Sequence, residues 1–255
     1  MDCPTPSLRP NTIERADAFG FLKSLPDESV DCVVTDPPYE SLRKWEGIGT
    51  TARMGLGQKG SGSDDPEKFF PTIPNARLAE LLDELYRVLK PERHAYVMCD
   101  DDTLPYIFEA VGFGKKMKKW KNLKILVWDK VNLGMGYHYR CRKEYVIMLD
   151  KGKNRRLNDL TVPDILSFKK DGNEVPTQKP VALFEVLVKQ STQPGETVLD
   201  PFMGAGTAAV ASAKNGRKYV GCDIDQSHVA IGNRRVAEIS GADSGETTCQ
   251  AVAWS

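Results

Sequence analysis

Short apolar runs alternate with amphipathic stretches along most of this chain. Runs rich in β-branched and aromatic residues predict buried strands at 12–17, 30–35, 94–99, 123–128, 144–149, 197–200 and 217–223. Apolar residues at helical spacing predict helices at 19–25, 75–90, 102–111, 181–191, 207–213 and 227–239. This alternation is typical of a doubly wound, mostly parallel α/β sheet. Because 123–128 and 144–149 are both strand-like, we expect them to form an antiparallel pair at one edge.

Three segments interrupt this rhythm. Residues 41–75 are rich in glycine and in polar loop formers, and residues 152–176 also lack periodicity. A long irregular stretch inside a compact domain is usually functional or disordered, so 41–75 is a candidate mobile segment. The Ser-, Gly- and Thr-rich end, 241–255, predicts a flexible tail. Residues 1–240 are therefore expected to form a single domain.

Composition narrows the class of protein. With 40% hydrophobic and 27% charged residues among 255, the chain is ordinary for a soluble globular protein. No apolar run is long enough for a membrane span, and the first residues are too polar for a signal peptide. The six cysteines form no CxxC pair and have no metal-ligand spacing with the three histidines, which favours free thiols, no metal and a cytoplasmic location.

The four residues Asp36, Pro37, Pro38 and Tyr39 follow the predicted strand 30–35. Two consecutive prolines fix φ and remove two backbone N–H groups, so this corner offers carbonyl acceptors and few donors. A carboxylate on one side and an aromatic ring on the other suit a flat ring that carries an amine. The alternative is a strand end capped by Asp36, with Tyr39 in the core.

A second corner follows the predicted strand 197–200. Gly204-x-Gly206-x-x-Ala209 permits a tight turn, and the helix that begins near Thr207 directs its positive end toward a ligand. Asp223 lies about 20 residues further on, where a ribose-binding acid is expected. This glycine pattern alone suits a nicotinamide cofactor as well as another adenosine cofactor, and the aspartates have an alternative role as helix caps.

Taken together, the motifs resemble a known family. Asp36-Pro37-Pro38-Tyr39, then Thr177-Gln178-Lys179-Pro180, then the run from Asp200 to Thr207 resemble the amino-methylating DNA methyltransferases of the circularly permuted beta group. The resemblance covers roughly 12–39 and 75–235. It implies a Rossmann-like methyltransferase sheet, S-adenosyl-L-methionine as cofactor, and methylation of adenine N6 or cytosine N4 in duplex DNA on a flipped-out base. The Asp of the first motif resembles the adenine enzymes more.

The resemblance also implies roles for residues. Catalysis is expected at Asp36, Pro37, Pro38 and Tyr39. Cofactor binding is expected at Asp17, Ala18, Asp36, Lys179, Asp200, Phe202, Gly204, Gly206, Thr207, Asp223 and Ile224. Lys179 has an alternative as a solvated lysine at a helix start. Two features depart from the family pattern: Glu40 follows the catalytic motif, and the 152–176 segment is short for target recognition.

Clustered basic residues complete the expectation, although the formal net charge is +0. DNA contacts are expected from Arg43, Lys44, Trp45, Arg53, Lys118, Lys119, Lys121, Arg140 and Arg142. The short recognition segment also favours a homodimer on the DNA. The rival functions are a nicotinamide-dependent dehydrogenase, a methyltransferase that acts on RNA, protein or a small molecule, and a catalytically silent DNA-binding relative.

Overall fold

The computed structural model describes residues 8–45, 71–117, 119–134, 138–153, 155–170, 175 and 178–242. Its strands are β1 (Thr12–Arg15), β2 (Val30–Thr35), β3 (Leu89–Cys99), β4 (Leu123–Asp129), β5 (Lys143–Lys151), β6 (Ile165–Ser167), β7 (Thr197–Asp200) and β8 (Lys218–Asp223). Its α-helices are α1 (Ala18–Ser24), α3 (Leu78–Val88), α4 (Leu104–Val111), α5 (Val181–Ser191), α6 (Thr207–Lys214) and α7 (Gln226–Ala242). Two 3₁₀ helices, η1 (Glu40–Trp45) and η3 (Asn75–Arg77), flank residues 46–70.

Across the described ranges the strands form one eight-stranded sheet in the order β1-β8-β7-β2-β3-β5-β4-β6. Only β5 runs against its neighbours, β3 and β4, and every other pair is parallel. The predicted antiparallel pair is therefore confirmed. The chain winds outward in one direction from β2 and in the other from β7, and these two strands are hydrogen-bonded neighbours. Ligands of doubly wound sheets bind at such a switch point, beyond the carboxyl ends of the strands.

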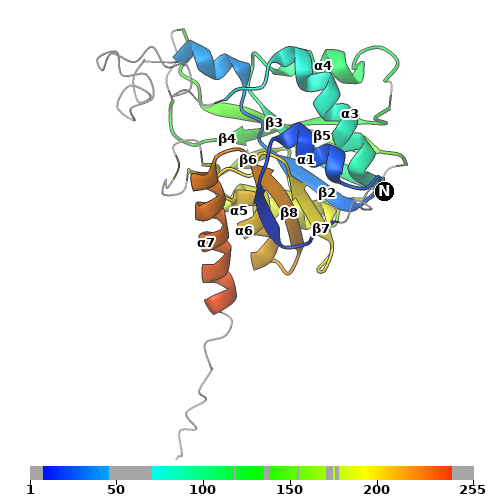
Figure 1. Ribbon diagram of the computed structural model, residues 1–255. Helices are drawn as coiled ribbons and strands as arrows, with labels where there is room; N and C mark the ends of the chain where they lie inside the picture. The colour runs from blue at the N-terminus through cyan, green and yellow to red at the C-terminus, as the bar shows by residue number, and fades with distance from the viewer. Residues whose placement is uncertain are drawn as a thin grey trace, which may run out of the picture.

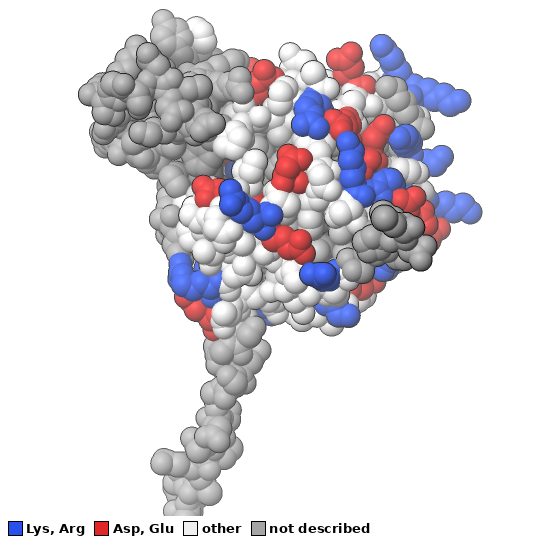
Figure 2. Space-filling view, viewed as in Figure 1, with Lys and Arg blue, Asp and Glu red and all other residues white. Residues whose placement is uncertain are grey.

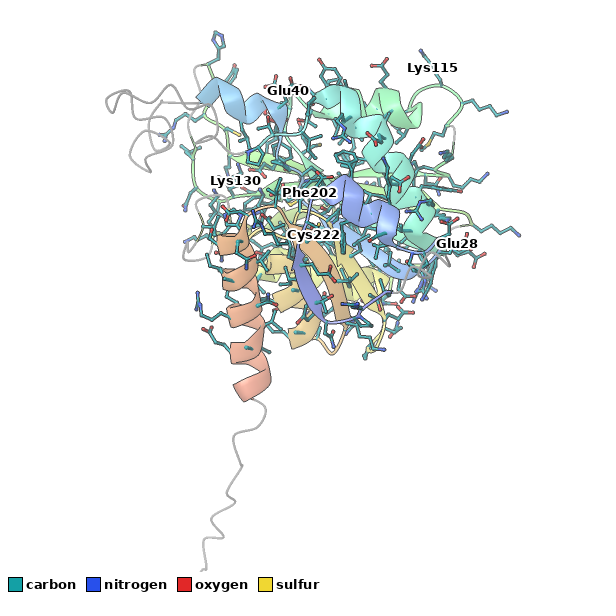
Figure 3. All side chains as sticks on the ribbon, viewed as in Figure 1. Glu28, Glu40, Lys115, Lys130, Phe202 and Cys222 are labelled. Atoms are coloured by element: carbon teal, nitrogen blue, oxygen red, sulfur yellow. The ribbon has the colours of Figure 1, made fainter. Side chains whose placement is uncertain are left out.

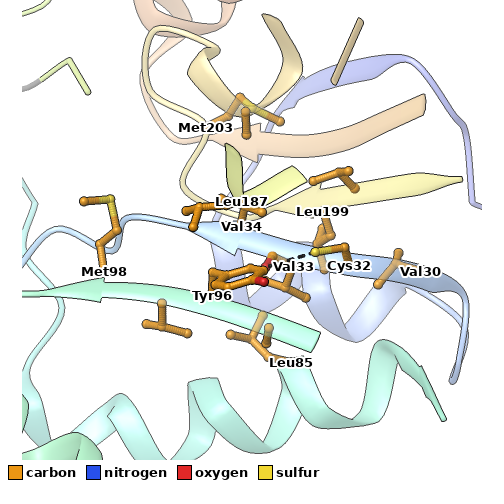
Figure 4. Close-up of a cluster of buried hydrophobic side chains, with 14 of the residues drawn as sticks. Val30, Cys32, Val33, Val34, Leu85, Tyr96, Met98, Leu187, Leu199 and Met203 are labelled. Carbon is orange, nitrogen blue, oxygen red and sulfur yellow. Dashed lines mark hydrogen bonds between the residues drawn. The ribbon is translucent and has the colours of Figure 1, made fainter. Parts of the chain in front are cut away.

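Helices cover both faces of the sheet. In Figure 1, α1, α3 and α4 lie together on one face, and α5, α6 and α7 lie on the other. All six residues of β2 are buried, as expected for a central parallel strand. Figure 4 shows Leu85 of α3 and Leu187 of α5 approaching the central strands from opposite faces. Because Leu85 is fully buried, truncating it to alanine would cost about 2–5 kcal/mol of stability.

The structure and the sequence prediction differ most at two places. The helix expected to reach residue 90 ends at Val88, and β3 begins at once with the buried Leu89 and passes through Pro91. Residues 90–93 are polar or proline and none of them is buried, so this part of the strand carries no hydrophobic signal. The strand β6 lies within the segment predicted to be loop, and it pairs with β4 from Val127 to Asp129. Three residues are too few to show an alternating pattern.

The described residues bear on two expectations from the sequence, the absence of a membrane span and the absence of a metal site. None of the described helices combines the length and apolarity that crossing a bilayer requires. Within the same ranges, no group of three or more His, Cys, Asp or Glu side chains is arranged to hold a metal ion. Cys32, Cys99 and Cys222 are buried free thiols, and Cys141 is an exposed one.

Candidate active site

The corner after β2 is rigid and rich in acceptors. The Tyr39 hydroxyl donates to Asp36 Oδ1 at 2.5 Å, and the Ile73 N–H donates to the Pro38 carbonyl at 2.9 Å. Pro37 and Pro38 have no backbone N–H to donate. Tyr39 is 7% exposed, so its ring is largely packed into the protein, and its hydroxyl fixes the Asp36 side chain. The corner therefore presents two acceptors, the Asp36 carboxylate and the Pro37 carbonyl.

Lys179, which precedes α5, is an integral part of this corner. Its ammonium donates to Asp36 Oδ2, and its Nζ lies 3.4 Å from Glu144 Oε2 on β5. A second lysine, Lys130, contacts Glu144 Oε1 at 2.6 Å. The Lys179 side chain is only 9% exposed, which rules out the alternative of a solvated lysine. Two carboxylates and two ammonium groups thus alternate at the carboxyl edge of the sheet.

The network sets the charges. Burial raises the pKa of Asp36 above its ordinary value, and the Lys179 ammonium opposes this rise. Burial also disfavours the charged form of Lys179, yet the Asp36 and Glu144 carboxylates outweigh it and raise the pKa of Lys179. For Glu144, Lys179 and Lys130 outweigh burial and hold the pKa below its ordinary value. Lys179 is therefore a permanent cation, and it favours the ionised form of Asp36.

The corner after β7 is built differently. Asp200 Oδ1 accepts from the Thr35 hydroxyl at 2.7 Å and from the Phe202 N–H at 3.0 Å. This carboxyl group is 2% exposed, and burial raises its pKa to about 7. The Gly204 N–H donates to Asp223 Oδ2 at 2.8 Å, with Gly204 in the left-handed region at φ 51°. A Cβ at Gly204 would meet nothing within 4 Å, so its surroundings are open to a ligand.

Gly206 has a structural reason instead. A Cβ on it would lie 2.7 Å from the Gly232 Cα of α7, and its φ is 77°. Gly206 therefore allows α6 and α7 to approach closely, so this structure gives it a packing role. The cofactor role expected of Gly206 stays a prediction. Sequence spacing alone cannot separate these two uses of glycine.

The ends of β8 and β1 complete the region. Asp223 Oδ1 accepts from the Asp225 N–H at 2.9 Å and lies 3.3 Å from His228 Nδ1, and this contact raises the pKa of His228. Asp17 Oδ2 caps α1 by accepting from the Gly20 N–H at 2.9 Å. Asp17 thus fulfils the helix-cap alternative while it also lines a cavity. Ile224 is 52% exposed, which is unusual for an isoleucine and suits an apolar contact with a ligand.

One cavity of about 390 Å³ is lined by residues from the corner after β2, the corner after β7 and the ends of β1 and β8. The predicted site residues that line it are Asp17, Ala18, Asp36, Pro37, Pro38, Tyr39, Lys179, Phe202, Gly204, Thr207, Asp223 and Ile224. Asp200 and Gly206 lie behind the wall. Lining residues for which the sequence analysis gave no role include Phe19, Arg77, Glu144, Lys170, Gln178 and His228. Gln178 belongs to a motif that the sequence analysis named without giving this residue a role, whereas Glu144 comes from the antiparallel strand β5 and carries no motif signal.

The predicted DNA-binding residues fall into three groups. Strand register places the chain before β4 toward the amino ends of the parallel strands, the edge of the sheet far from Asp36. Leu123 is already level with Val33, because Leu123 pairs with Leu149, Leu149 with Ala95 and Ala95 with Val33. Lys119 and Lys121 precede β4 at this far edge, and Lys119 contacts Asp83 at 2.9 Å. In Figure 3, Lys115 of the same cluster and Lys130 lie on opposite sides of the molecule. The structure does not bring this cluster together with the site, and Lys118 lies outside the described residues.

Arg140 and Arg142 lie at the same edge as Asp36. Arg142 makes a two-point ion pair with Asp129, with distances of 2.6 Å and 2.8 Å. Arg140 is exposed, bonds to the Gly134 and Leu133 carbonyls, and has no acidic partner among the described residues. Figure 2 shows basic and acidic side chains interspersed on the face it displays.

The remaining predicted DNA contacts fall on the segment after Tyr39. Arg43, Lys44 and Trp45 belong to η1, but their side chains and all of Arg53 lie outside the described residues. The described residues on either side of 46–70 contact each other beside the corner after β2. Ile73 pairs with Tyr39, and Glu40 Oε2 accepts from the Asn75 N–H at 2.8 Å. The unusual Glu40 thus ties the two ends of this segment together.

The fold and the site define a Rossmann-like enzyme whose acceptor corner and glycine corner share one cavity, and comparison with known proteins gives the family. A family model described as DNA methylase, of the N6/N4 type, matches residues 30–234. The chain belongs to this N6/N4 DNA methylase family. It is 26% identical to the DNA adenine methyltransferase YhdJ of Escherichia coli (strain K12), over 88% of this chain and 82% of that one.

Two solved structures share the fold. The crystal structure of the M1.HpyAVI-SAM complex has a TM-score of 0.63 at 22% identity, and it covers 88% of this chain and 98% of that chain. The PvuII DNA methyltransferase, which is cytosine-N4-specific, has a TM-score of 0.61 at 14% identity, with 91% and 94% covered. The mostly parallel, Rossmann-like sheet predicted from the sequence is confirmed by these likenesses.

Proposed function

We propose that this protein transfers a methyl group to the exocyclic N6 amine of adenine in duplex DNA. One observation carries the proposal: Asp36 and Pro37 line the same cavity as Gly204 and Asp223. A single cavity can therefore hold a methyl donor at one end and an amine at the other. The dehydrogenase alternative gives the acceptor corner no role.

The residues at the glycine end fit S-adenosyl-L-methionine. This cofactor supplies a methyl group that is activated by its attachment to a sulfonium sulfur. The open surroundings of Gly204 allow the backbone to approach the methionine part, together with Phe202 and Thr207. Asp223 would accept from the ribose hydroxyls and Ile224 would pack on the adenine. Asp17 and Ala18, which line the same cavity, would bind its amino edge. The similar fold of M1.HpyAVI, which was crystallised as a SAM complex, supports this assignment.

The chemistry of the target explains the acceptor corner. The lone pair of an aromatic amine is delocalised into its ring, so the nitrogen is a weak nucleophile. Acceptors that bind its two N–H groups favour a pyramidal nitrogen and offset the positive charge that develops on it as it gains a methyl group. Asp36 and the Pro37 carbonyl would act in this way, and such preorganised groups change rates roughly 100- to 1000-fold each. Both residues line the cavity, which supports these roles. Holding the amine in line with the methyl group supplies much of the remainder.

Adenine is favoured over cytosine by two observations. The catalytic motif begins with Asp36, which resembles the adenine enzymes, and the relative YhdJ is named a DNA adenine methyltransferase. The second candidate is cytosine N4, since the cytosine-N4-specific PvuII enzyme has a similar fold. Both amines are flat and exocyclic, so the same corner serves either reaction.

Contacts with the duplex belong at the edge of the sheet that carries Asp36. We assign them to Arg140, to Arg142 and to the segment with Arg43, Lys44, Trp45 and Arg53, and we do not extend them to Lys119 or Lys121. Flipping the base costs a few kcal/mol, which phosphate contacts and stacking offset.

Because the recognition segment 152–176 is short, a homodimer would supply further contacts. Light scattering of the protein with and without DNA tests this, and a monomer in both would exclude the dimer.

The test of the function is direct. The protein is incubated with S-adenosyl-L-methionine and duplex DNA of mixed sequence, and the digested DNA is examined by mass spectrometry. We expect 6-methyladenine. Finding only 4-methylcytosine would move the assignment to the second candidate, and methylation of RNA or protein but not DNA would overturn it.

A further inference from the structure

Lys179 lies between two carboxylates that come from different strands. Its ammonium contacts Asp36 Oδ2, at the end of β2, and lies 3.4 Å from Glu144 Oε2, on β5. The exposed fractions of the three side chains are 9% for Lys179, 20% for Asp36 and 15% for Glu144. One largely buried cation is therefore shared by two largely buried acids, one of which belongs to the catalytic motif.

One carboxylate oxygen of Glu144 has a close partner, and the other makes no hydrogen bond among the described residues. Lys130 holds Oε1 at 2.6 Å, whereas Oε2 is buried and makes no hydrogen bond among the described residues. At 3.4 Å, the Lys179 ammonium is an ion-pair partner that is too distant for a charge-assisted hydrogen bond. A buried carboxylate oxygen without a donor is costly, so Oε2 is a ready acceptor close to Lys179.

Both oxygens of Asp36, by contrast, already accept a hydrogen bond. Oδ1 accepts from Tyr39 and Oδ2 accepts from Lys179. Each oxygen keeps a further lone pair, so a substrate amine becomes a third donor to this carboxylate and weakens the two bonds already there. Tyr39 lies in the same proline-stiffened corner as Asp36, whereas Lys179 has a flexible four-carbon stem and a second acceptor within reach. Lys179 is the donor that can leave without becoming an unpaired buried charge.

We propose that Lys179 exchanges its hydrogen bond between the two acids: it holds Asp36 in the empty site and moves to Glu144 Oε2 when the target amine reaches Asp36. The displacement required is small, about 0.6 Å, to bring the 3.4 Å contact to the length of a charge-assisted bond. Glu144 is then a positioning residue for the reaction, acting through Lys179. The inference rests on the proposed function, since it requires an amine at Asp36.

If Lys179 moves between Asp36 and Glu144, a neutral residue at position 144 slows turnover, an effect that the charge of Glu144 on Asp36 alone does not predict. The charged or titratable groups around Asp36 are Tyr39 from its own corner, Lys179, Glu144 from β5, Lys170 and, behind the wall, Asp200. The negative charge of Glu144 raises the pKa of Asp36, so a neutral residue there favours ionised Asp36 and, by charge alone, moves the acid limb of activity to lower pH. In the exchange, the same change removes the charged acceptor for Lys179 and slows turnover at every pH.

The experiment measures kcat, KM for duplex DNA and their pH profiles with cofactor at saturation. For Glu144→Gln we expect kcat to fall about 10- to 100-fold, with unchanged cofactor affinity and an acid limb at lower pH than in the wild type. For Lys179→Met, loss of the cation raises the pKa of Asp36, so the acid limb should move to higher pH. Lys179→Arg keeps the charge and should leave the acid limb near that of the wild type. The control is Lys124→Met, since Lys124 pairs with Asp164 on the surface.

Melting temperature and cofactor calorimetry verify that each variant is folded. Wild-type kcat in Glu144→Gln would overturn the inference, and so would a fall in kcat that reverses fully at low pH. Failure of the proposed function is distinguished in the same assay, because it would appear as a wild-type protein that forms no methylated adenine or as full activity in Asp36→Ala.

Discussion

The corners after β2 and β7 both begin with an Asp-Pro pair, but the residues that follow the pair give them opposite hydrogen-bonding character. The two strands are neighbours in the sheet, with Val33 beside Leu199, and each delivers an Asp-Pro pair at its carboxyl end. After β2 a second proline comes next, so the two prolines of this corner contribute carbonyl acceptors and no N–H donor. After β7 the chain continues to Gly204, and N–H groups of this turn bond to Asp200 and to Asp223. The residues after the Asp-Pro pair decide whether the corner receives a donor, such as an amine, or encloses a ligand with its backbone.

The two aspartates also differ in charge control. Asp36 contacts the buried ammonium of Lys179, whereas Asp200 accepts only neutral donors among the described residues, the Thr35 hydroxyl and the Phe202 N–H. Burial therefore raises the pKa of Asp200 to about 7. In the proposed function Asp36 is the acceptor for the reacting amine, whereas Asp200 stabilises the turn after β7 by accepting from the Phe202 N–H. Variants at each corner test this division.

The largest effect is expected for Asp36→Ala. Turnover should fall by roughly 100- to 1000-fold, because the main acceptor for the amine is lost, while cofactor affinity remains nearly intact. Steady-state kinetics and calorimetry measure the two quantities. Asp164→Ala, which removes an exposed carboxylate, is the matched control. Near-normal turnover in Asp36→Ala would remove the acceptor corner from the mechanism.

Asp200→Asn should stabilise the cofactor-free protein in a pH-dependent way. With a folded pKa of about 7 against an ordinary value of 3.8, Asp200 carries no penalty below about pH 4 and a growing penalty up to about pH 7, which is constant above it. Asparagine keeps an oxygen for Thr35 and Phe202, so unfolding at pH 8 should cost about 2–4 kcal/mol more than in the wild type. Denaturation at pH 8 and pH 4 checks this, and an equal effect at both pH values would contradict it.

Asp223→Ala should weaken cofactor binding with less effect on chemistry at saturation. A lost charged hydrogen bond is worth roughly 1.5–3 kcal/mol, which corresponds to about a 10- to 100-fold increase in Kd. Calorimetry measures it, with Asp159→Ala as the control, since Asp159 caps only its own loop at Thr161. Unchanged affinity would mean that Asp223 serves only Gly204 and the start of α7.

The smallest expected effect is a change in the salt dependence of DNA binding. It distinguishes contacts near the carboxyl ends of the parallel strands, where Asp36 lies, from contacts near their amino ends. Affinity for duplex DNA should fall as salt rises, and Arg140→Ala should reduce the slope of log K against log salt by about 0.9, the value of one phosphate contact. Lys121→Ala, at the opposite edge, should leave the slope unchanged. An equal reduction in both variants would return the far-edge cluster to the DNA interface.

Sequence reasoning succeeded where chemistry lies at the end of a buried strand. Asp36, Gly204 and Asp223 all come after runs whose hydrophobic pattern is clear, and the parallel topology then places them together. It gave no signal where strand register decides the position. Glu144 reaches the site because β5 runs antiparallel to β3. Lys119 precedes β4 and lies near the amino ends of the parallel strands, and its contact with DNA stays a prediction.

Some features have no local signal at all. Gly206 has the spacing of a ligand-binding glycine, but α7 passes close to it, and only the packed structure shows the contact with Gly232. The ion pair of Arg142 with Asp129 depends on the register of β4 and β5, which no sequence pattern specifies. The sequence motif pointed to Lys179, but it could not reveal that two acids share its charge.

The most direct test of the account is a crystal structure of the protein with S-adenosyl-L-homocysteine and a duplex that contains its target adenine. We expect the N6 atom of the target adenine within hydrogen-bonding distance of Asp36 and the Pro37 carbonyl. We also expect the nucleoside of the cofactor analogue against Asp223, and Lys179 in contact with Glu144. An adenine whose amine faces other groups, or a cofactor bound away from Gly204 and Asp223, would contradict it.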